Sequence, residues 1–403
     1  MMHYLRFDLR TLLACAALFL IVTGCTTAPP TNETSELDFG SAVNVATDGL
    51  VAQTQKLPAF LAQVDAKLNK RGVVVDPMLD AASGQQTAAT RLLEQRIVER
   101  LQSNYTQFDV LAFQAGNLAK AQYLLTGTLT RIQGRQQGAR AAFQINLALT
   151  DLKTGIVVAQ ASSRARDEGL DMNPTPYYRD SPIILVKDKV VDGYIQTCVT
   201  LPGRPADPVY FQRIATATLV NDGTLAYNSE HYQDSLNSYR SAQATAAGDQ
   251  LRVLNGIYLT TWRLGRTAEA EQAFGQVVAL GLSNNSLGVK FLFNPGTTDF
   301  WSDPKISGPY AFWLRQIARQ TAASKVCMTI VGHTSHTGSE QLNDRLSQQR
   351  AAYIKQRLDT DAPELASRTR ATGMGFRENI VGTGTDDASD ALDRRVEFKI
   401  TGC

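Results

Sequence analysis

The residues best suited to chemistry lie between Val326 and Arg350, where an apolar run, a polar loop and a helical pattern follow one another without a gap. Gly332 and Gly338 bound the loop, whose small polar residues leave main-chain N–H groups available to a ligand. Arg350 carries a planar set of N–H donors that matches a carboxylate. These residue types predict noncovalent recognition of an anion.

A strand and a helix are needed to position this loop. Val326 to Val331 is a β-branched and apolar run, which is typical of an interior strand. The helix is expected to begin near Ser339. Four of its residues are spaced by four, three and four and so share one face, namely Asn343, Ser347, Arg350 and Ile354.

These residues, with a second motif near the C-terminus, resemble the OmpA-like peptidoglycan-binding family. The family pattern is a GHTD-x-x-G loop, then N-x-x-L-S-x-x-R-A, then NRRVE in the last strand. The chain departs from it at Ser335, where the family usually has aspartate, and at Asp393, where it has asparagine. The matching positions are Gly332, His333, Thr334, Gly338, Asn343, Leu346, Ser347, Arg350, Ala351, Arg394, Arg395, Val396 and Glu397.

The resemblance implies noncovalent binding of the peptidoglycan peptide stem. In the family, the loop aspartate binds the ammonium group of diaminopimelate and the helix arginine binds its carboxylate. With Ser335 in place of this aspartate, only the contact between the arginine and the carboxylate remains. We therefore expect weaker binding unless Asp344 or Asp393 compensates. The alternative is that Arg350 pairs with an acidic residue of the fold, which would leave a protein-binding or structural remnant. The expected binding residues are Gly332, His333, Thr334, Ser335, Gly338, Asn343, Leu346, Ser347, Arg350 and Arg394.

Metal binding and catalysis are not indicated. His333 and His336 are three apart in a loop and lack a third ligand nearby in the sequence. The acidic segment Gly382 to Asp393 does not follow the calcium-loop pattern. Since no nucleophile is paired with a base, we expect no metal, no cofactor, no catalytic residue and no enzyme activity.

The N-terminal sequence is typical of an export signal. Arg6 and Arg10 flank the apolar segment Leu12 to Val22, which is too short to span a membrane and ends in Val22-Thr23-Gly24-Cys25. We expect a lipoprotein signal peptide over residues 1–24, lipidation of Cys25 and a tether over 25–38. An ordinary secretory signal is the alternative. The absence of Asp after Cys25 resembles lipoproteins of the outer membrane, so we expect an anchored protein that faces the periplasm.

The net charge bears on nucleic-acid binding, and the cysteines bear on disulfide pairing. The chain has 40 basic and 38 acidic residues, a net charge of +2, which gives no indication of nucleic-acid binding. After Cys15 is removed and Cys25 is lipidated, Cys198, Cys327 and Cys403 remain. Cys327 begins a strand and Cys403 follows the last strand, so an antiparallel pairing would bring them together. We therefore predict a Cys327–Cys403 disulfide and a free Cys198.

Residues 39–202 predict an α/β domain. They resemble the periplasmic domain shared by lipoprotein activators of penicillin-binding proteins, curli-secretion lipoproteins and flagellar-assembly lipoproteins. A helix is expected over Thr87 to Ser103 and a strand over Tyr123 to Ile132. The resemblance rests on a V-V-V-D-P strand, the Arg91 to Leu101 part of that helix, the Tyr123 to Thr128 part of that strand and the LTDLKTGIVVAQA hairpin. Asp76, Asp80 and Asp151 are expected to cap strand ends or turns. A short helix is expected at Leu118 to Ala121.

Residues 210–285 predict a helical region with an internal repeat. Each of four small or aromatic positions recurs 35 residues later, close to the period of about 34 in tetratricopeptide repeats. Such units either dock a partner or space the flanking domains, and the sequence does not separate the two. The pairs are Tyr232 and Thr267, Ser235 and Ala270, Tyr239 and Phe274, and Ala242 and Val277.

Residues 289–403 predict an OmpA-like α/β sandwich of a mixed sheet against two helices, so the fold class is multi-domain α/β. The expected first strand is Phe291 to Phe293, the first helix Tyr310 to Ala322 and the last strand Arg394 to Ile400. We expect an outer-membrane lipoprotein that binds peptidoglycan. The alternative is a periplasmic regulator or assembly factor, with a protein partner at residues 39–282 and wall binding only for placement.

Overall fold

The computed structural model describes residues 36–54, 70–132, 141–184, 187–285, 287–294, 297–380, 382, 384 and 393–403. The signal peptide, Cys25 and most of the tether lie outside the described residues. Two separate sheets combined with many helices make the chain a multi-domain α/β protein, as expected. Residues 36–403 pack together as one compact unit. Among the described residues, no helix has both the length and the apolar character needed to cross a bilayer.

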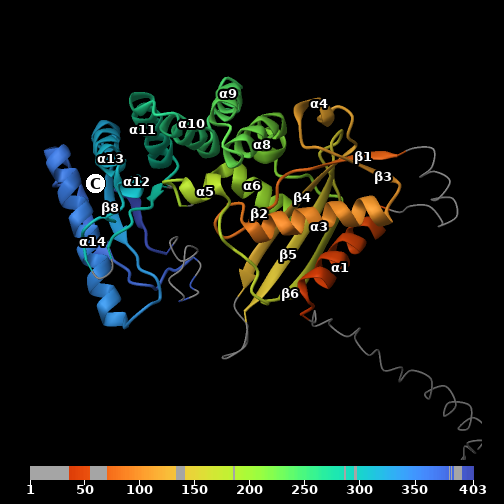
Figure 1. The fold of residues 1–403 in the computed structure, drawn as a ribbon, viewed down its shortest axis with the longest axis horizontal. Helices are drawn as coiled ribbons and strands as arrows, with labels where there is room; N and C mark the ends of the chain where they lie inside the picture. Colours follow the sequence, from red (N-terminus) through yellow and green to blue (C-terminus); the bar gives the residue numbers. More distant parts are fainter. Residues whose placement is uncertain are drawn as a thin grey trace, which may run out of the picture. The chain divides into compact units, whose positions relative to one another are not determined.

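The first sheet has six strands and is mixed (Figure 1). In spatial order, the three strands at one edge pair in parallel. The third of these strands and the two that follow it form an antiparallel meander. Gly155, with φ of +69°, makes the turn of the expected hairpin. In spatial order the strands are β3 (Phe108–Leu111), β1 (Arg71–Val75), β4 (Tyr123–Ile132), β5 (Ala142–Asp151) and β6 (Val157–Arg166), with the short β2 (Leu79–Asp80) also on β4.

Helices cover both faces of this sheet. Val73 and Val75 pack on one face with α1 (Phe39–Ala52) and α3 (Ala88–Asn104), whereas Val74 packs on the other with α6 (Lys189–Cys198) and α7 (Pro208–Phe211). Thr87, where the helix was expected to begin, forms a capping box at the start of α3. The expected short helix at residues 118–121 is instead α4 (Ala115–Leu118), and α5 (Pro176–Asp180) was not predicted.

Four longer helices follow, namely α8 (Ile214–Asn228), α9 (Tyr232–Gln243), α10 (Leu251–Arg263) and α11 (Thr267–Ser283). The repeated positions Ser235, Tyr239 and Ala242 of α9 and Ala270, Phe274 and Val277 of α11 are all buried. A Cβ at Gly256 would lie 2.5 Å from the Tyr239 ring, so α9 and α10 approach closely only because this residue is glycine. The tetratricopeptide-like character stays a prediction.

The second sheet has four strands, in the order β7 (Leu287–Val289), β10 (Val396–Thr401), β8 (Cys327–Gly332) and β9 (Thr369–Gly373). β10 is antiparallel to both neighbours, and β8 is parallel to β9. Its helices are α12 (Pro304–Ser307), α13 (Tyr310–Ser324) and α14 (Glu340–Asp361), with a short 3₁₀ turn η1 (Pro363–Leu365).

The expected strand at Phe291 to Phe293 is wrong. The edge strand is β7, a few residues earlier, because the phenylalanine side chains are buried in an aromatic cluster instead of alternating across a sheet. Phe291 stacks on Phe300 with ring centroids 5.7 Å apart and meets Tyr310 edge-on at 5.2 Å.

One hydrophobic core joins the helical region to the second sheet. It runs from Leu236 in α9 through Phe274 in α11 to Phe398 in β10. Trp313 of α13 stacks on Phe274 with centroids 5.4 Å apart, and its indole N–H donates to the Tyr258 hydroxyl at 3.0 Å. A cut before residue 289 would therefore expose apolar surface on both sides.

The predicted disulfide is present. Cys327 and Cys403 are bonded, with Cα atoms 5.1 Å apart. The antiparallel register of β8 and β10 places Thr401 opposite Cys327, which brings the chain end to the bond, as the sequence argument required. Cys198 is a buried free thiol.

Candidate functional site

The loop expected to bind a ligand lies between β8 and α14. β8 ends at Gly332, and Ser339 caps α14 by accepting the Leu342 N–H at 3.3 Å. A Cβ at Gly332 would lie 2.3 Å from the Ser347 carbonyl oxygen, so only glycine allows α14 this close to the strand. The first turns of α14 are thereby held against the end of the sheet.

Part of the loop main chain is already used, which corrects the expectation of free amides. The His333 N–H donates to the Arg395 carbonyl at 3.0 Å, and the Thr334 N–H donates to the Gly375 carbonyl at 2.9 Å. These bonds extend the strand pairing past the end of β8. Within the described part of the chain, the N–H groups of His336, Thr337 and Gly338 have no acceptor.

Two predicted site residues on α14 hold neighbouring segments. The Asn343 amide donates to the carbonyls of Thr337 and Ser339 at 3.0 and 3.1 Å, which fixes the end of the loop. The Ser347 hydroxyl accepts the Gly375 N–H at 2.9 Å. Both are buried together with Arg350 and Ile354, so the expected shared face exists. Leu346 is half-buried.

Arg350 is buried, with an exposed fraction of 5%. Its Nε and Nη2 groups donate to the carbonyls of Thr297 and Asn294, each at 3.3 Å, and its guanidinium carbon lies 4.8 Å from the centroid of the Phe293 ring. These bonds are long and their acceptors are neutral, so each is weaker than a charge-assisted bond to a carboxylate. The guanidinium is therefore ordered before any anion binds.

The two acidic residues that could have compensated for Ser335 are already engaged. The Asp393 carboxylate is buried and accepts the N–H groups of Ile380 and Gly382 at 2.6 and 2.8 Å. Asp344 pairs with Arg377 at 2.6 Å. Ser335 is 6% exposed and Arg394 is half-buried. Neither acidic residue is a ready substitute for the family aspartate.

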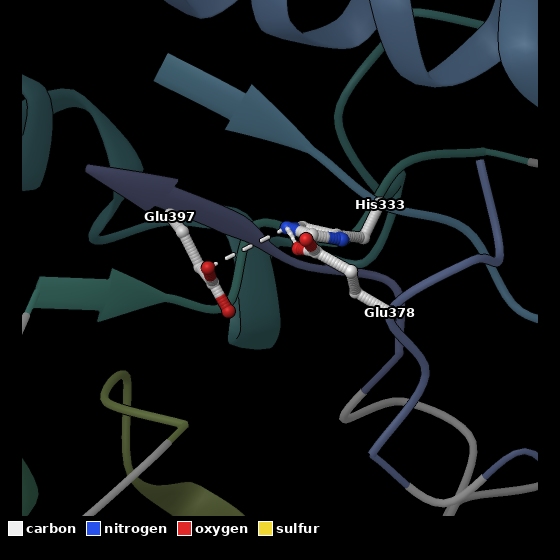
Figure 2. A group of neighbouring side chains, drawn as sticks. All are labelled: His333, Glu378 and Glu397. Carbon is white, nitrogen blue, oxygen red and sulfur yellow. Dashed lines mark ion pairs between the residues drawn. The ribbon is translucent and has the colours of Figure 1, made fainter. Parts of the chain in front are cut away.

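Sequence reasoning missed two carboxylates beside His333 (Figure 2). Nε2 of the buried His333 ring lies 3.6 Å from Oε2 of Glu397 and 3.9 Å from Oε2 of Glu378. Burial raises the pKa of Glu397, but the His333 imidazole and the Arg395 guanidinium more than offset this and lower it to about 2. The antiparallel pairing of β8 and β10 could have indicated Glu397, whereas nothing in the pattern marks the loop residue Glu378.

The acidic residues singled out in the first sheet differ in their surroundings. Asp151 accepts the N–H groups of Lys153 and Thr154 in the hairpin turn, and Asp80 accepts the Ser83 hydroxyl. Asp76 is buried and accepts the Tyr210 hydroxyl at 2.6 Å. Burial raises the pKa of Asp76 to about 6, with the Tyr210 bond opposing this.

A groove of about 450 Å³ lies between α11 and α13. The polar and charged residues of its lining include Glu271, Gln276, Gln316, Arg319 and Gln320, and Ala268 and Ala279 also line it. None of the site residues predicted from the sequence lines this groove.

Comparisons with known proteins each cover less than a third of the chain. No protein-family model matches. The chain is similar to the "Probable lipoprotein YiaD" of Escherichia coli strain K12, with 38% identity over 77 residues, which are 19% of this chain and 34% of YiaD. The chain thus spans about a third of the length of that relative.

Solved structures that are similar to this chain include a lipoprotein and a cell wall anchor. The peptidoglycan-associated lipoprotein from Burkholderia pseudomallei is 22% identical, with a TM-score of 0.24 over 28% of this chain and 89% of that one. The cell wall anchor of the T6SS from Pseudomonas aeruginosa is 22% identical, with a TM-score of 0.24 over 29% of this chain and 80% of that one.

Proposed function

We propose that this chain is an outer-membrane lipoprotein, facing the periplasm, that binds the peptide stem of peptidoglycan noncovalently and so links the membrane to the cell wall. In this proposal the chain is a binding protein and not an enzyme. The observation that carries it is Arg350, a buried and ordered guanidinium on α14, the helix that also carries Asn343 and Ser347 of the OmpA-like motif.

Two of the hydrogen bonds of Arg350 suit exchange for a ligand. They are long and go to neutral carbonyls, whereas bonds to a stem carboxylate would be charge-assisted and roughly twice as strong. Because the side chain is already buried over Phe293, little rotamer entropy is lost on binding. The N–H groups of His336 to Gly338, just before α14, are further donors for an anion.

Ser335 limits the strength of this site. A hydroxyl can accept a hydrogen bond from the ammonium group of diaminopimelate but carries no charge, and Asp344 and Asp393 are held elsewhere. We expect a loss of about 1 to 2 kcal/mol of binding free energy relative to a site with aspartate there.

The lipid anchor rests on the sequence around Cys25 and is supported by the match to YiaD, which is named as a lipoprotein. Intact-mass analysis of the mature chain tests it, because a lipidated Cys25 should be the first residue. Cys25→Ala protein that still fractionates with outer membranes would contradict the anchor.

A second candidate is a regulator or assembly factor whose protein partner binds residues 39–282. It is favoured by the extent of structure that wall binding does not use, namely the six-stranded sheet and helices α8 to α11. In that case wall binding would serve only for placement, and variants that abolish it would leave the cellular phenotype intact.

Co-sedimentation with purified sacculi tests the proposed function. The chain without its first 25 residues should sediment with sacculi, and a soluble stem peptide containing diaminopimelate should displace it. Sacculi stripped of their stems by an amidase are the matched control. Equal sedimentation with stripped sacculi would show that the stem is not the ligand.

A further inference from the structure

Three side chains converge beside β10 (Figure 2), and of these only His333 is among the residues expected to bind the wall. His333 comes from the loop after β8, Glu378 from the segment after β9 and Glu397 from β10 itself. One ligand atom of each lies within 4.8 Å of the other two. We propose that His333, Glu378 and Glu397 bind a divalent first-row metal ion, for which Zn²⁺ is the probe.

The two separations from His333 fit such an ion after a small contraction, and the two carboxylate oxygens lie within 4.8 Å of each other. Bonds of about 2.0 to 2.2 Å in a tetrahedral arrangement place ligand atoms about 3.4 Å apart. Nε2 of His333 lies 3.6 and 3.9 Å from the two carboxylate oxygens. The Glu378 side chain is 39% exposed and lies on a loop, so it can make the small movement required. One nitrogen and two oxygens are ligands that Zn²⁺ and its neighbours accept.

The imidazole supplies an independent indication of a ligand. The His333 side chain is fully buried, and neither ring nitrogen has a hydrogen-bond partner within the part of the chain that the structure describes. A buried polar group without a partner is destabilising. Its Nε2 points toward both carboxylates in Figure 2, so a bound cation would satisfy this atom.

Arg395 holds both glutamates in place. Its Nε donates to Oε1 of Glu397 at 2.6 Å, which leaves Oε2 toward His333, and its Nη2 donates to the main-chain carbonyl of Glu378 at 3.0 Å. The Arg395 side chain is only 3% exposed. Partners that orient ligating carboxylates in this way are typical of metal sites.

A cation already stands beside the two carboxylates. The Lys399 ammonium lies 3.3 Å from Oε2 of Glu378 and 3.9 Å from Oε2 of Glu397. Its side chain is 48% exposed, so it can move into solvent when a metal ion binds. The competing interpretation is a purely structural ion-pair network, in which Lys399 is the final cation. The two interpretations predict opposite effects of removing Lys399.

Zn²⁺ titration tests the proposal on the chain without its first 25 residues, which keeps the whole compact unit. After dialysis against a chelator, a chromophoric zinc indicator competes for the metal. The wild type should bind one Zn²⁺ per chain. Glu378→Gln should weaken binding by at least about tenfold, since it removes a ligand. Lys399→Gln should strengthen binding, since no ammonium then competes.

His336→Gln is the control for incidental binding by an exposed histidine and should bind Zn²⁺ as the wild type does. Circular dichroism checks that each variant is folded. If Glu378→Gln is unfolded, the Zn²⁺ affinities of the wild type and Lys399→Gln test the proposal. Absence of stoichiometric binding to the wild type would overturn the site. Equal affinity of wild type and folded Glu378→Gln, or weaker binding by Lys399→Gln, would also overturn it.

Discussion

The guanidinium carbon of Arg350 lies 4.8 Å from the centroid of the Phe293 ring. Helix α14 and the segment before α12 therefore meet at the residue on which the proposed wall binding depends. Because the same guanidinium also donates to the carbonyls of Asn294 and Thr297, this segment holds it in one position. The site is preorganised by residues that lie more than 50 positions earlier in the chain.

The first prediction concerns Ser335. Ser335→Asp should tighten binding to sacculi roughly tenfold, because a carboxylate would bind the stem ammonium through a charge-assisted bond. Equilibrium co-sedimentation over a range of sacculus concentrations measures the change. Ser335→Asn, which is similar in size and neutral, should bind as weakly as the wild type; equal gains in both variants would refute the charge argument.

The second prediction concerns the disulfide. Cys327 and Cys403 are separated by 76 positions, and closing a loop of this length is worth about 4 kcal/mol in the chain-entropy description. The Cys327→Ser/Cys403→Ser double variant should therefore lose about that much unfolding free energy in urea. Reductant should destabilise the wild type to the same degree and leave the double variant unchanged. Wild-type protein that is fully reduced by mass yet unfolds at its original midpoint would contradict this.

The third prediction is a pH dependence caused by Asp76. Burial raises the pKa of Asp76 to about 6 in the folded chain, above its value near 3.8 when exposed. The folded state thus binds the proton more tightly than the unfolded state does. The contribution of this protonation to the free energy of unfolding is complete below about pH 4 and is lost as the pH rises through 6. The loss by pH 7 is on the order of 3 kcal/mol.

Asp76→Asn mimics the protonated form and can still accept the Tyr210 hydroxyl. Its unfolding free energy should fall less between pH 4 and 7 than that of the wild type. Urea titrations at each pH measure the unfolding free energies of both chains. The contributions of titrating groups that the two chains share cancel in the difference. Parallel curves for the two chains would exclude Asp76 as the source.

Local signals predicted much of the fold. The strand Tyr123–Ile132, the Gly155 hairpin and the caps at Thr87 and Ser339 follow from alternation, turn chemistry and capping residues, all of which act over a few positions. Cys327 and Cys403 could be paired because the strands that carry them were identified correctly. The predicted strand at Phe291 is wrong, because three consecutive apolar residues are as compatible with an aromatic cluster as with a strand.

The candidate site was predicted less completely because its details depend on contacts distant in sequence. The motif placed Arg350 on the correct helix, but its bonds to Asn294 and Thr297 come from another segment. Likewise, Glu378 reaches His333 only through the folding of the loop after β9. Periodicity identifies a buried face but does not identify the side chains that meet it.

The central claim is tested most directly by sacculus binding of Arg350→Gln, with Arg345→Gln as the control on an exposed position of the same helix. Circular dichroism establishes that both variants are folded. We predict that Arg350→Gln no longer sediments with sacculi, whereas Arg345→Gln sediments as the wild type does. A folded Arg350→Gln chain that binds sacculi with wild-type affinity would contradict the account.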